Sequence, residues 1–316
     1  MKKILCIGSV TTDVMLSPVD ALPRPGVLQA VGTSSIHVGG CASNAAIDLA
    51  KLGAPAALAC RVGRDSFGSF VKEQAAGAGV EISWVVEGPE QTTTSVVCIN
   101  SEGERSFLYY PGSTSAFTRQ DLPDPLPEDC GIVFVAGAML MDAFDGEPCA
   151  ALLRQAQGQG KYTVMDTAWD FQGVWLPKVA PSLPWLDLFM PSLEEAQQLS
   201  GREEPADIAD FFLERGVKNV IIKLGSKGAY FCPAGGERFT LPACQGVKAV
   251  DTTGAGDAFC AGFLCGLAQG WDFRRCGQLA NAAGALCVME MGASTGLRPL
   301  AEAQEFLKQH EGGTWH

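Results

Sequence analysis

The stretch VDTTGAGDAFCAGFLCG, residues 250–266, sets an acid beside small residues in a way that could do chemistry. Gly254, Ala255 and Gly256 precede a long apolar run that predicts a buried helix, and Asp257 lies in its first turn. The first N–H groups of a helix have no partner within it, and the helix dipole adds partial positive charge there. Such a helix start can hold a phosphate, and Asp257 could accept the proton of an attacking hydroxyl. The alternative is a helix-start acid that only stabilises the dipole.

Two other stretches could bring a ligand to Asp257. In VGGCASNAAIDLAKLG, residues 38–53, Gly39 and Gly40 precede a predicted helix, and Asn44 lies in its first turn. Paired glycines allow a ligand to approach the backbone closely, and an Asn side chain offers hydroxyl groups a donor and an acceptor. Asp13 follows the first predicted strand, where its carboxylate could bind a diol at the carboxyl edge of a parallel sheet.

Several familiar site types are absent from the sequence. It contains no G-x-x-x-x-G-K-[ST], which excludes a P-loop. GAGDAF begins like a Rossmann fingerprint, but Phe259 stands in place of the third small residue. RDSFG has Arg64 where a hydrolase elbow needs its first glycine. Only three histidines are present, and two of them, His310 and His316, lie near the C-terminal end, so histidine-based catalysis has little material.

The composition is that of an ordinary globular protein and disfavours binding to nucleic acid or to anionic membranes. The 316 residues are 47% apolar and 18% charged, with a net charge of -12. Binding to nucleic acid or an anionic membrane needs clustered Lys and Arg, and no apolar run approaches the ~18 residues of a membrane span. The twelve cysteines include no C-x-x-C pair, so we expect free thiols in the cytoplasm.

Predicted strands and helices alternate along most of the chain. KILCIG (3–8), AALACRVG (56–63) and GIVFVAG (131–137) predict strands, whereas CASNAAIDLAKLG has apolar residues at helical spacing. This alternation favours an α/β fold of three layers, α/β/α, around a parallel sheet. Residues 11–38 and 83–111 instead predict strands and hairpins alone. We expect them to form a small β-sheet lid on a large domain of residues 1–10, 39–82 and 112–316.

The stretches GGCASNAAIDLAKLG and DTTGAGDAFCAGFLCGL resemble, in the same order, the two signatures of the ribokinase-like (PfkB) carbohydrate kinases. The resemblance continues through GSVTTDV, GERSFLYYPGS, FMPSLEEAQQLSG, VIIKLGSKGAYF and ANAAGALCVMEMGA, and so covers nearly the whole chain. It implies a three-layer domain with a mostly parallel central sheet and a small β-sheet lid. It also implies phosphorylation of a sugar hydroxyl by ATP with Mg²⁺.

The resemblance assigns roles to the residues that match the family's motifs. Asp257 would be the general base, and Gly254, Ala255 and Gly256 would form the anion hole for the γ-phosphate. Asp251 and Thr253 match ligands of a monovalent cation such as K⁺, with a plain Asp-Thr turn as the alternative. The sugar-binding set would be Asp13, Gly39, Gly40 and Asn44, and the nucleotide-binding set would be Gly225, Ser226, Gly228 and Asn281.

Two positions depart from the family's pattern. Ser192 stands where the N-x-x-E segment usually has Asn, and Glu195 three residues later would organise the Mg²⁺ shell through water. Lys223 replaces a small polar residue; it could reach a phosphate or be a solvated charge at a strand end. Arg105 in the lid could reach substrate oxygens or cap a hairpin. Asp166 and Trp169 follow a predicted strand, where sugar binding and a structural role are both open.

The sequence therefore favours an ATP-dependent kinase of a small neutral sugar. A nucleoside kinase of the same fold and a catalytically silent regulatory relative are the alternatives. Within residues 11–44 only Arg24 supplies a cation, which disfavours a phosphosugar substrate. Unpaired strand edges in the lid would have a reason to pair, so we expect a homodimer through the lid.

Overall fold

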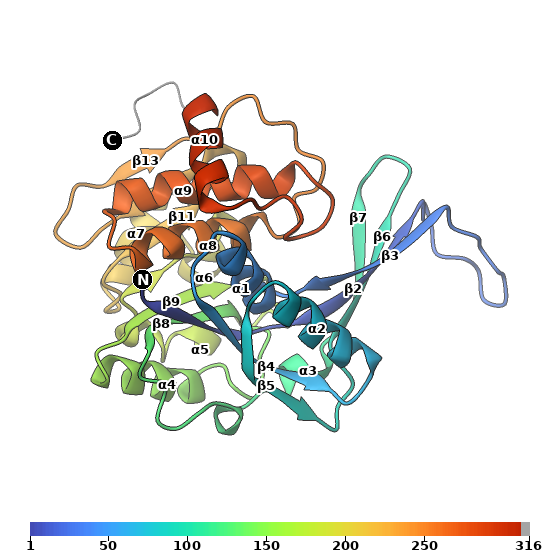
Figure 1. Ribbon diagram of the computed structural model, residues 1–316, viewed down its shortest axis with the longest axis horizontal. Coiled ribbons are helices and arrows are strands. Elements are labelled where there is room, and N and C mark those ends of the chain that lie inside the picture. Colours follow the sequence, from blue (N-terminus) through green and yellow to red (C-terminus); the bar gives the residue numbers. More distant parts are fainter. Residues whose placement is uncertain (311–316) are drawn as a thin grey trace.

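A nine-stranded sheet forms the centre of the protein, whose computed structural model describes residues 1–310 (Figure 1). The strand order is β13-β12-β11-β10-β9-β8-β1-β4-β5, and neighbours are parallel except that β12 is antiparallel to β11 and β13. The strands are β1 (Lys3–Gly8), β4 (Ala56–Gly63), β5 (Glu81–Gly88), β8 (Cys130–Ala138), β9 (Tyr162–Thr167), β10 (Leu188–Phe189), β11 (Val220–Lys223), β12 (Ala229–Cys232) and β13 (Phe239–Leu241).

The sheet is buried on both faces by helices. In β1, Ile4 and Cys6 point into one core and Leu5 and Ile7 into the other, as the period of two in a strand requires. One face is covered by α1 (Cys41–Lys51), α2 (Ser66–Gly77), α8 (Ala255–Ala268) and α9 (Phe273–Val288), with α10 (Leu300–His310) against α9 (Figure 1). The other face is covered by α4 (Glu147–Gly158), α6 (Leu193–Ser200) and α7 (Pro205–Leu213). The expected three-layer α/β/α fold is confirmed.

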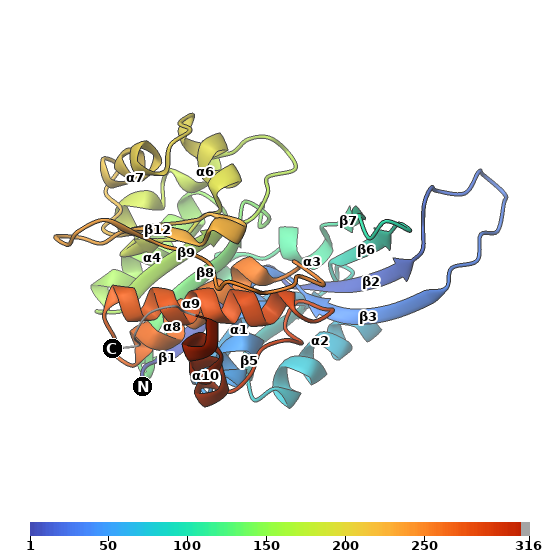
Figure 2. The same ribbon diagram turned by 90° about the horizontal axis from the view of Figure 1, so that it is seen from above.

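A separate four-stranded sheet forms the lid. Its order is β3 (Thr33–Gly39), β2 (Thr11–Ser17), β6 (Thr94–Ile99) and β7 (Arg105–Tyr110), and only the β2–β6 pair is parallel. Figure 2 shows the lid projecting from one side of the large domain, with the β2–β3 connection extending beyond it. Two segments far apart in the sequence thus build one small sheet, as expected.

The second lid segment is shorter than the expected residues 83–111. Strand β5 pairs in parallel with β4 at the edge of the large sheet, so the expectation that residues 83–88 belong to the lid is wrong. The half-buried pattern of SWVVEG suits an edge strand of either sheet, and only its pairing decides between them. The lid segment proper is the β6–β7 hairpin.

The register of the lid strands determines which residues share a face. Residues opposite each other in neighbouring strands lie on the same side of a sheet. One row across the four strands consists of His37, Asp13, Ser95 and Tyr109. The adjacent row, on the opposite face, consists of Ile36, Val14, Val96 and Leu108.

The twelve cysteines all lie within the described residues and form no disulfide, and among them Cys41 and Cys244 are the partly accessible ones. From residue 1 to residue 310, no helix has both the length and the apolar character to cross a bilayer.

Candidate active site

The start of α8 combines a tight turn with unused backbone donors. Its N-cap Gly254 has a φ of 77°, and a Cβ there would lie 2.4 Å from the carbonyl oxygen of Ala293. Glycine alone meets both conditions without strain. In the described part of the chain, no group accepts the N–H of Gly256 or Asp257. These donors and the positive end of the helix dipole are therefore available to an anion.

Asp257 lies in this first turn and is oriented by α1. The Asn44 side-chain amide donates a hydrogen bond to Asp257 Oδ2 at 2.8 Å. Burial raises the pKa of the Asp257 carboxyl, while the Asn44 hydrogen bond and the ammonium of Lys223 oppose that rise. The residue is half-buried, so a ligand can still reach it. An oriented, reachable carboxylate with a raised pKa has the properties of a general base.

Asp13 lies at the junction of the lid and the large domain, against Gly39. A Cβ on Gly39 would lie 2.1 Å from Asp13 Oδ2, and a Cβ on Gly40, where φ is 93°, would lie 2.5 Å from the Cα of Val10. The Thr11 hydroxyl donates to Asp13 Oδ1 at 2.9 Å. Burial raises the pKa of Asp13, and the Thr11 hydrogen bond opposes this. The glycine pair thus makes room for the carboxylate next to the start of α1.

Tyr109 is a candidate ligand-binding residue that the sequence alone did not single out. It lies in the lid row of Asp13 and Ser95, and its buried hydroxyl has no hydrogen-bond partner in the structure. The amide oxygen of Asn44 is likewise buried and unpartnered. Unmade hydrogen bonds on buried polar atoms are costly, so these two atoms are suited to a polar ligand. Only the strand register, which the sequence does not specify, aligns Tyr109 with Asp13.

Lys223 is not a solvated strand-end charge, so that expectation is wrong. Its ammonium lies 2.7 and 2.6 Å from the two oxygens of Asp166, and its side chain is only 11% exposed. Burial alone would lower the pKa of Lys223, but Asp166 raises it far above the usual range. A Cβ on Gly256 would lie 3.2 Å from Lys223 Nζ, so the ammonium borders the anion site.

Asp166 holds this lysine and has no oxygen left for a sugar. Its Oδ1 also accepts the Thr167 N–H at 2.9 Å, and its Oδ2 lies 3.4 Å from the thiol of Cys260. The side chain is 2% exposed. The structure therefore does not support the expected contact between Asp166 and substrate, and it favours the structural alternative.

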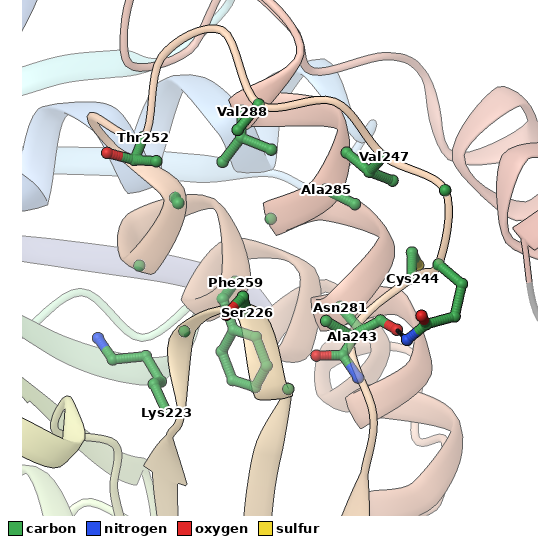
Figure 3. Close-up of a pocket in the computed structure, with 18 residues that line it drawn as sticks. Lys223, Ser226, Ala243, Cys244, Val247, Thr252, Phe259, Asn281, Ala285 and Val288 are labelled. Carbon is green, nitrogen blue, oxygen red and sulfur yellow. Dashed lines mark hydrogen bonds between the residues drawn. The ribbon is translucent and has the colours of Figure 1, made fainter.

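A cavity of about 540 Å³ opens beside the start of α8 (Figure 3). This volume suits a ligand of nucleotide size. In Figure 3, Lys223 and Ser226 come from the β11–β12 hairpin, and Asn281 comes from α9. The Asn281 amide donates to the carbonyl of Pro242 at 2.8 Å. The structure brings all the expected nucleotide-side residues to this one cavity: Lys223, Gly225, Ser226, Gly228 and Asn281, together with Ala255 and Gly256.

Ser192 and Glu195 form a capping box at the start of α6. Ser192 Oγ accepts the Glu195 N–H at 3.3 Å, and Glu195 Oε2 accepts the Ser192 N–H at 3.2 Å. The Thr167 hydroxyl donates to the same carboxylate oxygen at 2.8 Å. Burial raises the pKa of Glu195, and Lys223 opposes this. Serine in place of asparagine thus retains a helix cap and leaves Glu195 Oε1 without a protein donor.

Arg105 crosses from the lid to the large domain. Its Nη1 lies 2.7 Å from Asp251 Oδ1 and donates to the Thr253 hydroxyl at 3.0 Å. The structure therefore places Arg105 on the two residues expected to bind a monovalent cation, and not on the sugar-binding residues.

The chain is similar to known proteins over nearly its whole length. The chain matches the family described as pfkB family carbohydrate kinase over residues 1–299. It is 30% identical to 2-dehydro-3-deoxygluconokinase of Bacillus subtilis over 292 residues, covering 89% of this chain and 90% of the relative. It is 30% identical to aminoimidazole riboside kinase of Salmonella typhimurium over 323 residues, covering 98% and 96%.

A protein from Escherichia coli, solved in complex with ATP and Mg²⁺, superposes with a TM-score of 0.85 at 25% identity, covering 98% of this chain and 100% of that one. The fold, the paired signatures and the full-length match lead to one conclusion. The chain belongs to the pfkB family of carbohydrate kinases, phosphotransferases that act on a sugar hydroxyl.

Proposed function

We propose that the protein transfers the γ-phosphate of ATP to a hydroxyl of a small neutral sugar, with Asp257 as the general base. The observation that carries the proposal is the Asn44–Asp257 hydrogen bond at 2.8 Å, beside two unused N–H donors at the start of α8. A carboxylate and an anion site at one helix start can activate a hydroxyl and receive the phosphoryl group that it attacks.

The sugar would lie between the lid and the starts of α1 and α8. Asp13 Oδ2, the Asn44 amide oxygen and the Tyr109 hydroxyl are polar atoms there without protein hydrogen bonds. Gly39 and Gly40 leave the backbone open to the ligand. We assign these five residues to sugar binding.

The nucleotide would occupy the cavity beside α8, with Gly225, Ser226, Gly228 and Asn281 along its wall. The charge that develops on the transferred group would be met by the N–H donors around Gly254, Ala255 and Gly256. Lys223 adds a positive charge at their border. A pre-positioned donor set of this kind lowers the barrier because little reorganisation is needed.

The oxygen ligands available at the site also suit a Mg²⁺ ion held mainly by phosphates and water. Mg²⁺ is usually bound by one or two carboxylates together with substrate phosphates, and Glu195 Oε1 is a carboxylate oxygen without a protein donor. Among the described residues no cluster of three or more metal-binding side chains exists, which suits a metal that arrives with the nucleotide. When bound, the metal neutralises phosphate charge.

A neutral substrate fits better than an acidic one because the cations at the cleft are already engaged. Arg105 lies 2.7 Å from Asp251 Oδ1, and Lys223 lies 2.6 Å from Asp166 Oδ2. A sugar acid, as named for the Bacillus subtilis relative, would leave its carboxylate without a free partner.

A nucleoside or other riboside is the second candidate. Three aromatic side chains on the lid and the neighbouring loop are more than half exposed: Phe107 (57%), Trp169 (55%) and Phe171 (52%). Exposed rings can stack on a base or imidazole, and one relative is named for a riboside. A catalytically silent relative is disfavoured, since the base and the anion site are both intact.

The apolar lid row favours a homodimer. This row consists of Ile36, Val14, Val96 and Leu108. Its two outer side chains are well exposed, Ile36 at 49% and Leu108 at 53%. Sedimentation velocity should give a dimer that Leu108→Lys dissociates; a monomeric wild type would contradict the proposal.

The cysteines, which form no disulfide among the described residues, suit a reducing compartment such as the cytoplasm.

The test is ATP-dependent phosphorylation measured on ribose, fructose, other ketoses, inositols, 2-keto-3-deoxygluconate and nucleosides. Asp257→Asn should lower kcat on the best substrate by about 10²–10⁴-fold, as expected for loss of a general base. Asp272→Asn is a matched control, because Asp272 begins α9 as a helix-start acid outside the cleft. Turnover of no substrate, or equal effects of the two variants, would refute the proposal.

A further inference from the structure

The Arg105–Asp251 ion pair joins the lid to the loop that enters α8. Arg105 is the first residue of β7, and Asp251 precedes the N-cap Gly254 by three positions. The Asp251 side chain is fully buried and that of Arg105 is 15% exposed. With Nη1 at 2.7 Å from Asp251 Oδ1 and 3.0 Å from the Thr253 hydroxyl, one guanidinium contacts both residues. A cation from the lid therefore lies beside the anion site.

The charge of the Asp251 carboxylate is already paired, and most of its acceptor positions are in use. Besides Arg105, Oδ1 accepts the Thr253 N–H at 2.7 Å, and Oδ2 accepts the Gly292 N–H at 2.9 Å. Two backbone donors and a guanidinium thus use three of the roughly four acceptor positions of this buried carboxylate, and the guanidinium balances its charge.

The carbonyl groups around it are also in use. The Cys287 thiol has one proton to donate, and its sulfur lies 3.0 Å from the carbonyl oxygen of Ala293 and 3.4 Å from that of Thr253. The carbonyl of Val288 accepts the N–H groups of Val250 and Asp251, at 2.7 and 3.1 Å. A K⁺ ion needs several such oxygens, and here it would also stand next to a fixed positive charge. The residues expected to bind a monovalent cation thus do not fit one in this arrangement.

We propose that Arg105 takes the place of a monovalent cation, so that phosphoryl transfer by this protein does not require K⁺. The inference rests on the proposed kinase function. The guanidinium supplies the positive charge that fixes the loop of residues 251–254, and with it the anion site. Because Arg105 belongs to the lid, the loop is fixed by lid contact and not by the salt in solution.

The kinetic test compares initial rates in KCl, NaCl and tetramethylammonium chloride at one ionic strength, with the best substrate from the panel named under the proposed function. Wild type should vary by less than about twofold among the salts. In tetramethylammonium, Arg105→Gln should be about 10²-fold slower than wild type, the usual effect of removing one such charge. In KCl, the rate of this variant should recover to at least about a tenth of the wild-type rate. Arg105→Lys, which keeps a charge, should stay independent of K⁺. Arg24→Gln is the matched control, because it removes an exposed lid arginine.

A melting experiment tests the same inference without turnover. At equal ionic strength, KCl should raise the Tm of Arg105→Gln relative to tetramethylammonium chloride and leave wild type unchanged. A wild type that K⁺ activates or stabilises selectively would overturn the proposal. So would an Arg105→Gln variant that responds to K⁺ in neither assay, whether it is active or inactive. Failure to phosphorylate any substrate refutes the proposed function, whereas the melting result bears on the arginine alone.

Discussion

Replacing Asn44 by alanine tests how the pKa of Asp257, the proposed general base, is tuned. The Asn44 amide donates to Asp257 Oδ2 at 2.8 Å, which favours the charged carboxylate against its burial. A hydrogen bond to a charged group contributes about 1.5–3 kcal/mol. Losing it should raise the pKa of Asp257 further. Since 1.36 kcal/mol corresponds to one pKa unit, the acid limb of the kcat/KM profile should move upward by about one to two pH units.

The direction follows from the role of a base. Asp257 accepts a proton only when ionised, so activity is lost as pH falls through its pKa. Asn44→Ala should therefore lose about 10- to 100-fold at low pH and recover towards wild type at alkaline pH. Any deficit that remains at high pH measures the contact of the Asn44 amide oxygen with the sugar.

The assay is kcat/KM for the best sugar from about pH 5 to pH 9, the range in which such limbs are seen. Asn281→Ala is the matched control, since Asn281 lines the cavity proposed for the nucleotide and its amide donates to the Pro242 carbonyl. It should change the KM for ATP without moving the acid limb. An acid limb that stays in place in Asn44→Ala would refute the tuning role and leave Asn44 as a sugar contact alone.

Three further substitutions test the surroundings of the base. Lys223→Met should lower kcat by about 10²-fold. Lys178→Met is its control, because Lys178 is equally buried and also paired with an aspartate; this variant should lower the Tm and leave kcat near wild type. Gly254→Ala should cost more stability than the ~1–3 kcal/mol of left-handed strain, because its Cβ meets the Ala293 carbonyl at 2.4 Å. Gly235→Ala, at a φ of 67° with no neighbour within 4 Å, should cost the strain alone in urea unfolding. Asp48→Asn addresses a buried carboxyl whose pKa burial raises well above its usual value. Above about pH 4 the unfolded chain releases a proton that folded Asp48 keeps, so wild-type stability falls by about 1.4 kcal/mol per pH unit until the folded pKa is reached. The Tm of Asp48→Asn minus that of wild type should therefore increase from pH 4 to pH 8. A Tm difference that stays constant over this range would show that Asp48 is ionised when folded.

The sequence predicted the parts of the site that are local in the chain. Gly254 and Asp257 stand three positions apart, so the motif alone indicates a helix start with an anion site and an acid. The pair Ser192 and Glu195 is equally local, and S-x-x-E is itself a capping-box pattern. Ser192 therefore departs from the asparagine of the family's motif and still fits the helix that it begins.

Contacts between distant segments could not be predicted in this way. Lys223 and Asp166 are 57 residues apart, and nothing near Lys223 indicates a buried acid within 2.6 Å. Tyr109 faces Asp13 only because of the β2–β6–β7 register, and a slip of one residue would turn it to the opposite face. The assignment of residues 83–88 to the lid failed for the same reason, since strand pairing is a long-range property.

The charged groups of the cleft share one construction, in which each is fixed by a partner from a different element. Asp257 is held from α1, Lys223 from the end of β9, and Asp251 from the lid. Each substitution therefore disturbs a pair, and the effects of residues that act as a unit do not add. If Asn44 works through the base, Asn44→Ala should cost almost nothing further in an Asp257→Asn background, whereas Lys223→Met should keep most of its effect there because it acts on the phosphoryl group. If Asn44→Ala and Lys223→Met both kept their full effects in the Asp257→Asn background, Asn44 would act on the sugar and not on the base.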